Sequence, residues 1–190
     1  MNKKLMFVGL SVLALITALA VAPIFAEEGF PMPLEMRANG GINRGGRTSM
    51  INFTVREWTS SDDRAAMLEQ VKGGKSVREV MQAAGGAMGR IAPAGGMGID
   101  IRYAYKFDKD GGSTIILASD RPIDVGEATQ LGRNSLDFNV TLVVIEIDDS
   151  GDGAGSLWLG ADIQMGADGR FEVTGAGQDP VHLGRVRVLN

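Results

Sequence analysis

The sequence predicts an α+β domain built on a curved antiparallel β-sheet of about seven or eight strands, with one helical pair inserted after the first strand. Three observations support this fold class. Apolar residues alternate with polar ones in most segments after Thr48, as in strands that bury one face. One stretch, residues 59–86, has helical spacing instead. Short turns rich in Gly and Asp separate the other segments, which favours a meander of hairpins, with a sandwich-like arrangement as the alternative.

Residues 1–26 have the composition of a secretory signal peptide. Lys3 and Lys4 precede an uncharged apolar run at residues 5–22, and the small residue Ala26 is followed by two glutamates. We therefore expect cleavage after Ala26 and an exported protein, periplasmic or secreted, with no stable membrane span after cleavage. An uncleaved membrane anchor is the alternative, because the apolar run is about the minimum length that spans a bilayer.

Cleavage at this position would leave residues 27–190, a length typical of one domain. This part contains 17 basic and 23 acidic residues, a formal charge of −6, because Lys3 and Lys4 belong to the leader. The acidic balance argues against a nucleic-acid partner, since nucleic acid attracts clustered Lys and Arg. The chain contains no Cys, which excludes disulfide bonds, thiol catalysis and Cys-ligated metal sites.

The first segment after the leader, residues 27–46, contains two prolines, several glycines and no regular apolar period. We interpret it as a flexible arm that precedes a single β-rich domain at residues 47–190. The domain begins with a half-buried strand, in which Ile51, Phe53 and Val55 alternate with polar residues.

Two short helices are predicted directly after this strand. Hydroxyls and acids at residues 59–63 are typical of a helix start, and Gly73 and Gly74 end that helix. Ser76 and Glu79 form a capping box at the second helix, in which each side chain accepts a hydrogen bond from the other residue's backbone N–H. Each helix has one apolar stripe, so we expect the sheet to curl around the pair.

The rest of the chain has strand patterns. Residues 99–107 alternate most clearly, and a turn at 108–112 connects them to the apolar run at 115–117, so we expect a hairpin. Residues 136–145 alternate until position 143, which indicates a bulge or a strand covered on both faces. In the last strand the alternation reverses at Gly184, a natural position for a bulge.

Four motifs follow one another along the chain: GIDIRYAY from Gly98, IILASDRPI from Ile115, FNVTLVVIEID from Phe138 and GDGAGSL from Gly151. Together with the capped helices they resemble a group of exported bacterial proteins of unknown function, over roughly residues 47–190. The DRPI turn after a buried strand is an uncommon sequence. The resemblance implies export and the same fold, and it brings no activity, substrate or catalytic residue to this chain.

His182 is the only histidine, so a Ser-His-Asp triad would have to use it. It lies in a strand pattern, on the face opposite Val181 and Leu183, and no G-x-S-x-G motif accompanies it. We therefore interpret His182 as an exposed strand residue. One histidine also excludes zinc sites that need two.

Asp148, Asp149 and Asp152 lie in a stretch that resembles the start of a calcium-binding loop. Leu159 stands where the closing glutamate belongs, and strand patterns flank the stretch instead of helices. We therefore favour a tight turn over the alternative of a metal site, because Asp and Gly stabilise such turns by local hydrogen bonds.

A polar cluster at the end of a buried strand, Asp120, Arg121 and Glu127, is the candidate binding loop. We expect Asp120 to accept hydrogen bonds from backbone donors in the loop, and Arg121 to pair with Asp124 or Glu127. Such ion pairs commonly only stabilise a turn, so the cluster is where we would look first if the protein has a functional face.

No motif in the chain identifies an enzyme. We therefore expect an exported, non-enzymatic module that needs no cofactor and binds a ligand, a partner or the cell envelope through its loops. A small hydrolase that uses carboxylates in a cleft is the alternative. The two hypotheses differ in whether acidic side chains converge in a pocket and have raised pKa values there.

Overall fold

The computed structural model describes residues 30–40, 49–123, 140–166, 171–175 and 180–189. The signal peptide expected at residues 1–26, the expected partners Asp124 and Glu127, and the FN of the third motif lie outside the described residues.

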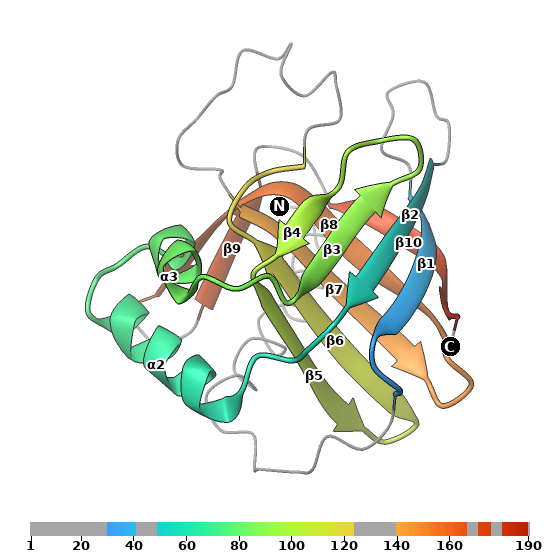
Figure 1. The fold of residues 1–190 in the computed structure, drawn as a ribbon, viewed down its shortest axis with the longest axis horizontal. Helices are drawn as coiled ribbons and strands as arrows, with labels where there is room; N and C mark the ends of the chain where they lie inside the picture. The colour runs from blue at the N-terminus through green and yellow to red at the C-terminus, as the bar shows by residue number, and fades with distance from the viewer. Residues whose placement is uncertain (1–29, 41–48, 124–139, 167–170, 176–179, 190) are drawn as a thin grey trace, which may run out of the picture.

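In the described part of the chain, ten strands form one antiparallel sheet (Figure 1). The strands are β1 (Leu34–Gly40), β2 (Ser49–Val55), β3 (Gly89–Pro93), β4 (Ile99–Ile101), β5 (Tyr103–Lys109), β6 (Gly112–Ser119), β7 (Val140–Asp148), β8 (Asp152–Met165), β9 (Phe171–Gly175) and β10 (Val181–Val188). Their order across the sheet is β4-β3-β2-β1-β10-β8-β7-β6-β5, and β9 pairs with β8 beside this path.

The sheet is nearly closed into a barrel, because its two ends are parts of one bent segment. Arg102 alone separates β4, which pairs with β3, from β5, which pairs with β6. The Arg102 backbone N–H donates to the carbonyl of Ala118 at 2.8 Å, so the bend itself is hydrogen-bonded to β6. One continuous curved sheet therefore replaces the sandwich-like alternative.

Strand side chains fill the inside of the curved sheet. Phe53, Ile91, Leu117, Ile145 and Leu157 are buried there, each at most 1% exposed. No residue of either helix belongs to this cluster. The expectation that the sheet curls around the helical pair is therefore wrong: the inward-facing apolar residues of the strands are numerous enough to fill the interior by themselves.

Both predicted helices are present, as α2 (Ser61–Lys72) and α3 (Val77–Ala84). The Ser60 side chain accepts a hydrogen bond from the Asp63 backbone at 3.1 Å and caps α2. The predicted capping box is confirmed: Ser76 N–H donates to Glu79 Oε2 at 3.0 Å, and Glu79 N–H donates to Ser76 Oγ at 3.2 Å. The two helices lie together on one side of the sheet, next to β9 (Figure 1).

The strand count and the position of the helices differ from the expectation for two reasons. The alternation at residues 99–107 predicts one strand, but the bend at Arg102 divides this segment into β4 and β5. Residues 34–40, expected to belong to the flexible arm, form β1 between β2 and β10. The helical pair therefore follows the second strand. Leu34, Met36 and Ala38 do alternate into the core, but the prolines before them and the glycines after them obscured this short pattern.

Two predicted details of the sheet are confirmed. The hairpin of β5 and β6 pairs from Tyr103–Ala118 to Lys109–Gly112. The register of β10 shifts between Leu183 and Val186, at the predicted bulge, where Arg185 has a φ of 52°.

Candidate functional site

The outward face of the strands next to the helices is as apolar as their inward face. All eight residues of β6 are buried, with Ile115 and Leu117 in the interior and Ile116 and Ala118 in a second cluster outside it. In β7, Val143 and Ile145 are buried in the interior and Val144 is half-buried against the second cluster, which fits a strand covered on both faces, one of the two alternatives predicted for that segment. An outward apolar face of this kind needs a cover, which the helical pair provides.

A cavity of about 120 Å³ lies between this face and the helical pair. Strands β5 to β9 and both helices contribute to its wall. The lining residues are Arg64, Met67, Leu68, Val71, Val77, Val80, Met81, Tyr103, Ile116, Ala118, Leu142, Val144, Ile163, Phe171 and Val173. All but Arg64 and Tyr103 have apolar side chains.

Side chains do not fill this cavity, because the two helices pack against the sheet to different depths. Helix α3 buries Val80 and Met81 against the sheet. Helix α2 has no buried residue, and its lining side chains Met67, Leu68 and Val71 are only half-buried. Its N-cap Ser60 follows the buried Thr59, whose hydroxyl accepts a hydrogen bond from the Ala104 N–H at 3.0 Å. The start of α2 is thus held to β5, while its apolar side chains do not fill the space over the sheet.

Tyr103 provides a buried polar group at the cavity wall. Its hydroxyl oxygen is inaccessible to solvent and has no hydrogen-bond partner among the described residues. Burial raises the pKa of Tyr103, so the hydroxyl keeps its proton at neutral pH and remains a donor. A buried tyrosine hydroxyl usually has a partner, so the Tyr103 hydroxyl is an exception among the described residues.

Arg64, in the first turn of α2, provides a positive charge at the same cavity. Its Cζ atom lies 3.9 Å from the centroid of the Tyr105 ring, a cation–π contact. The contact uses the face of the guanidinium group, and the buried Nε has no hydrogen-bond partner among the described residues. Within that part of the chain, no carboxylate forms an ion pair with Arg64 either.

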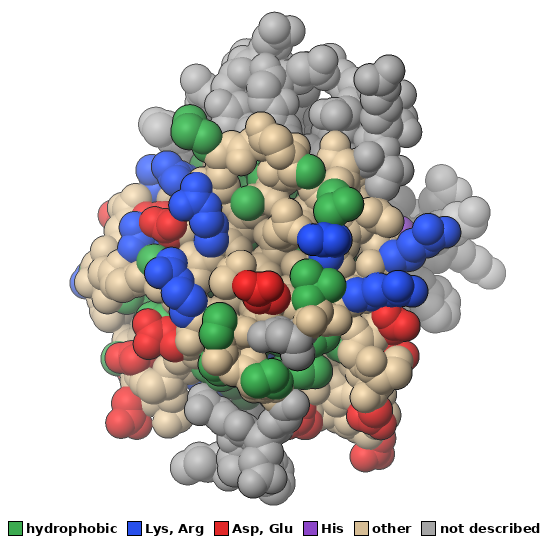
Figure 2. All heavy atoms as spheres, turned by 45° about the vertical axis from the view of Figure 1, so that its right-hand side comes forward, with side chains coloured by type: hydrophobic (Ala, Val, Ile, Leu, Met, Phe, Trp, Pro, Cys, Tyr) green, Lys and Arg blue, Asp and Glu red, His purple; other side chains and the backbone are tan. Residues whose placement is uncertain are grey.

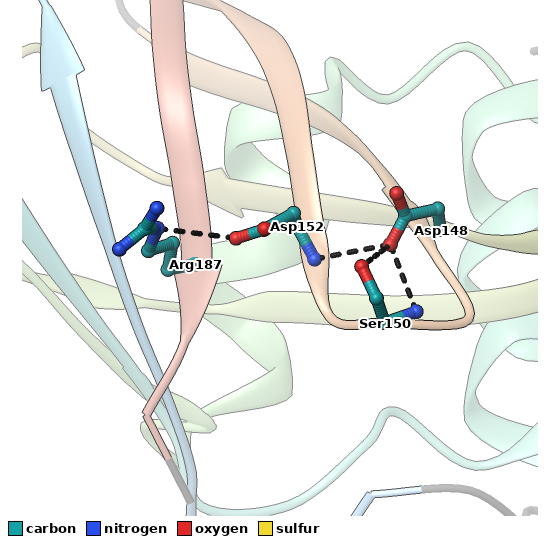
Figure 3. A network of polar contacts seen from close by, with 4 residues as sticks. All are labelled: Asp148, Ser150, Asp152 and Arg187. Atoms are coloured by element: carbon teal, nitrogen blue, oxygen red, sulfur yellow. Dashed lines mark hydrogen bonds and ion pairs between the residues drawn. The ribbon is translucent and has the colours of Figure 1, made fainter.

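The stretch predicted to be a tight turn, with a calcium loop as the alternative, is a hydrogen-bonded turn between β7 and β8 (Figure 3). Asp148 Oδ1 accepts hydrogen bonds from the Ser150 N–H at 2.9 Å, the Ser150 hydroxyl at 2.6 Å and the Asp152 N–H at 3.1 Å. These donors, the Ser150 hydroxyl first, lower the pKa of Asp148. Asp152 pairs with Arg187 Nε at 3.2 Å, and Asp149 is exposed. Among the described residues, no three His, Cys, Asp or Glu side chains are grouped to hold a metal ion.

Asp120 and Arg121, the described residues of the candidate binding loop, do not line the cavity. Asp120 lies 3.6 Å from Arg102 Nε, at the bend that closes the sheet. Arg121 is exposed, and its carbonyl accepts a hydrogen bond from the Thr141 hydroxyl at 3.0 Å. Glu127 lies outside the described residues, so the expected pairing with Arg121 stays a prediction.

His182 is exposed on β10, away from the cavity. Figure 2 is turned so that the β1 and β10 side of the molecule comes forward, and it shows Lys and Arg side chains in separate groups with acidic side chains among them. The cavity is therefore the candidate site.

The sequence patterns did not identify the two polar residues of this site, Arg64 and Tyr103, as site residues. Tyr103 was placed correctly in a strand, but no pattern in the sequence shows that its hydroxyl is buried without a partner. The run Ile115-Ile116-Leu117 was the one available signal, because three consecutive apolar residues mean that both faces of a strand are covered.

Neither helix in the described part of the chain is long and apolar enough to cross a membrane. No protein-family model matches the sequence, no curated protein matches it, and no solved structure matches the fold. The function therefore has to be inferred from the geometry of the cavity.

Proposed function

We propose that this protein is an exported, non-enzymatic module that binds a small apolar molecule in the cavity beneath α2 and α3. The observation that carries the proposal is the cavity of about 120 Å³ whose wall is apolar except for Arg64 and Tyr103. Ligand sites are typically concave and mostly apolar, with a few polar groups that orient the ligand. Export rests on the leader at residues 1–26.

The size of the cavity limits the ligand. An engineered protein cavity of about 150 Å³, lined by apolar side chains, stays free of water and binds benzene. The present cavity is slightly smaller and similarly lined, although it is partly open to solvent, and its volume suits one aromatic ring or a short alkyl chain. Because α2 has no buried residue, a small outward movement of this helix would admit a somewhat larger molecule.

The alternative of a carboxylate-dependent hydrolase has no support at this site. No acidic side chain among the described residues lines the cavity. A general acid in a cleft would have a raised pKa, but hydrogen bonds lower the pKa of Glu79 and that of Asp148. Both carboxylates have structural roles: Glu79 accepts a hydrogen bond at the α3 cap, and Asp148 accepts one in the β7–β8 turn.

Titration with benzene, an uncharged apolar probe, tests the proposal. Binding to the folded state alone raises its stability by about 1.4 kcal/mol when the free probe is at ten times its Kd. For a chain of this size the melting temperature should rise by roughly 3–6 °C. The rise should saturate as the benzene concentration increases.

Two variants locate the binding. Ala118→Leu places three additional carbons at the floor of the cavity and should abolish the response to benzene. Ala154→Leu is the matched control, because it adds the same atoms at an exposed position of β8 outside the cavity, and it should respond like the parent protein. An equal response of both variants, or no saturable response of the parent, would contradict the proposal.

A further inference from the structure

We propose that two copies of this protein associate through strand β9, whose outer edge pairs antiparallel with β9 of the second copy. This inference concerns an interaction surface and does not depend on a ligand in the cavity. Its starting point is the topology of the sheet. The main path of strands is nearly closed, but β9 lies beside that path, and β8 is its one strand partner among the described residues.

The edge of β9 is regular and carries little that would prevent pairing. Its register with β8 is unbroken over five residue pairs, from Phe171 opposite Met165 to Gly175 opposite Ala161. Proteins commonly protect an edge strand with Pro, Lys, a bulge or a covering segment, because its N–H and C=O groups can pair with another strand. Strand β9 contains no Pro, no Lys and no register shift. The helical pair lies over its face, where Phe171 and Val173 line the cavity, and a cover on the face does not occupy the edge.

The residue pattern of β9 is complementary to itself. A two-fold axis at Val173 pairs all five residues: Phe171 lies opposite the partner's Gly175, Glu172 opposite the partner's Thr174, and Val173 opposite the partner's Val173. The large ring thus faces a residue without a side chain, and no like charges are opposed. An axis at Glu172 would instead place two carboxylates directly opposite each other, which is destabilising. The sequence of β9 therefore favours one register.

This register continues the apolar face that lines the cavity. Phe171, Val173 and Gly175 are half-buried on one face of β9, and Glu172 and Thr174 are exposed on the other. Directly opposite residues of paired strands share a face, so the partner's Val173 lies beside Val173 and covers apolar surface that is half-exposed in a single copy. A five-residue edge is a small interface, so we expect a weak and reversible dimer.

Charge changes on the exposed face of β9 test the register. Sedimentation equilibrium measures the dimer Kd of the parent protein and of each variant. Thr174→Glu places two symmetric pairs of carboxylates opposite each other and should weaken the dimer by roughly 2- to 30-fold. Adding Glu172→Lys to Thr174→Glu turns both pairs into opposite charges and should restore dimerisation at least to the parent level.

The double variant separates association from effects within one chain. Residue 174 lies opposite Asp162 of β8, and the carboxylate of Thr174→Glu remains there in the double variant, so a restored dimer cannot come from relief of that contact. Thr54→Glu is the matched control, because it adds the same charge on β2, which pairs with β1 and β3, and should leave the dimer Kd unchanged. Thermal unfolding shows whether each variant is folded.

Amide hydrogen exchange locates the contact. Exchange in β9 should slow as the protein concentration rises, whereas exchange in β2 should not change. A parent protein that stays monomeric at millimolar concentration would overturn the inference. Equal effects of Thr174→Glu and Thr54→Glu on the dimer Kd, or no rescue by the added Glu172→Lys, would overturn it as well. The response to benzene tests the cavity separately, so either proposal can fail while the other stands.

Discussion

Replacing Ala118 by Leu and, separately, Ala104 by Leu tests whether the two faces of the curved sheet differ as the structure describes. Both alanines are buried, at 4% and 0% exposure, and they lie on neighbouring strands. Ala118 lines the cavity, whereas Ala104 belongs to the filled interior. The same three added carbons should therefore stabilise the fold at one position and destabilise it at the other.

The magnitudes follow from the cavity volume and from the cost of overpacking. At about 24 cal/mol per Å³, a fully enclosed void of about 120 Å³ would withhold about 3 kcal/mol of stability; the present cavity is partly open to solvent, so this figure is an upper bound. Three added carbons recover about 2.4 kcal/mol by burial and lose about 0.5–1 kcal/mol of side-chain entropy, a net gain of about 1.5 kcal/mol for Ala118→Leu. Overpacking by Ala104→Leu should cost about 1–3 kcal/mol.

Thermal unfolding followed by circular dichroism measures both effects. Ala118→Leu should raise the melting temperature by roughly 3–6 °C, and Ala104→Leu should lower it by roughly 2–12 °C. If Ala118→Leu lowers the melting temperature as much as Ala104→Leu does, side chains already fill the space beneath the helices, and the basis of the proposed site is gone.

Three further substitutions test local features. Asp148→Asn should reduce the loss of stability that the parent protein shows below about pH 4. The folded-state pKa of Asp148 is lowered, so its contribution to the free energy of unfolding is present above its unfolded pKa of about 3.9 and is lost as the pH falls through the folded value. Urea titrations at several pH values would measure this difference. Gly153→Ala should destabilise the fold by roughly 2 kcal/mol or more, because the added Cβ would collide with the backbone carbonyl of Glu146 on β7. Urea unfolding measures this loss. An unchanged unfolding midpoint would contradict the register of β7 with β8. Ser76→Ala should lower the free energy of unfolding by about 1 kcal/mol, because it removes the side chain that caps α3. An equal loss in Glu79→Gln would show that the hydrogen bond from the Ser76 N–H to the Glu79 side chain contributes as much as the bond to the Ser76 hydroxyl.

The sequence predicted best those features whose causes lie within a few residues of one another. Ser76 and Glu79 are three positions apart, and their reciprocal hydrogen bonds follow from that spacing alone. The β5–β6 hairpin was equally accessible, because a short turn fixes which strands pair. The bulge at Gly184 was visible as a reversal of the apolar alternation within one strand.

The features that the sequence did not predict depend on distant parts of the chain. Strand β1 pairs with β10 far along the chain: Met36 lies opposite Val188, which follows it by 152 positions. Three alternating apolar residues between prolines and glycines are too weak a pattern to reveal such a partner. The direction in which the sheet closes was equally hidden, because the bend at Arg102 lies inside an unbroken strand pattern.

The candidate site could be predicted only in part, because a cavity is an absence of packing. The apolar stripes of both helices and the double-sided run in β6 were evident, so a contact between them could be expected. Whether Met67, Leu68 and Val71 fill the space above Ala118 depends on the height of α2 over the sheet, which no pattern in the sequence encodes.

Strand β6 takes part in both the core and the candidate site, and its alternation should separate folding from binding. Ile115 and Leu117 face the interior, which is filled without any helix residue, whereas Ile116 and Ala118 face the cavity. Truncating Leu117 to Ala should therefore cost about 2–5 kcal/mol of stability. Truncating Ile116 to Ala should cost less, because its neighbours already border an unfilled space, and it should enlarge the cavity enough to admit a bulkier apolar probe such as naphthalene. Urea unfolding and naphthalene titration of the two variants would show whether alternate residues of one strand carry these separate roles; equal losses of stability with no gain in binding would mean that both faces of β6 are packed alike.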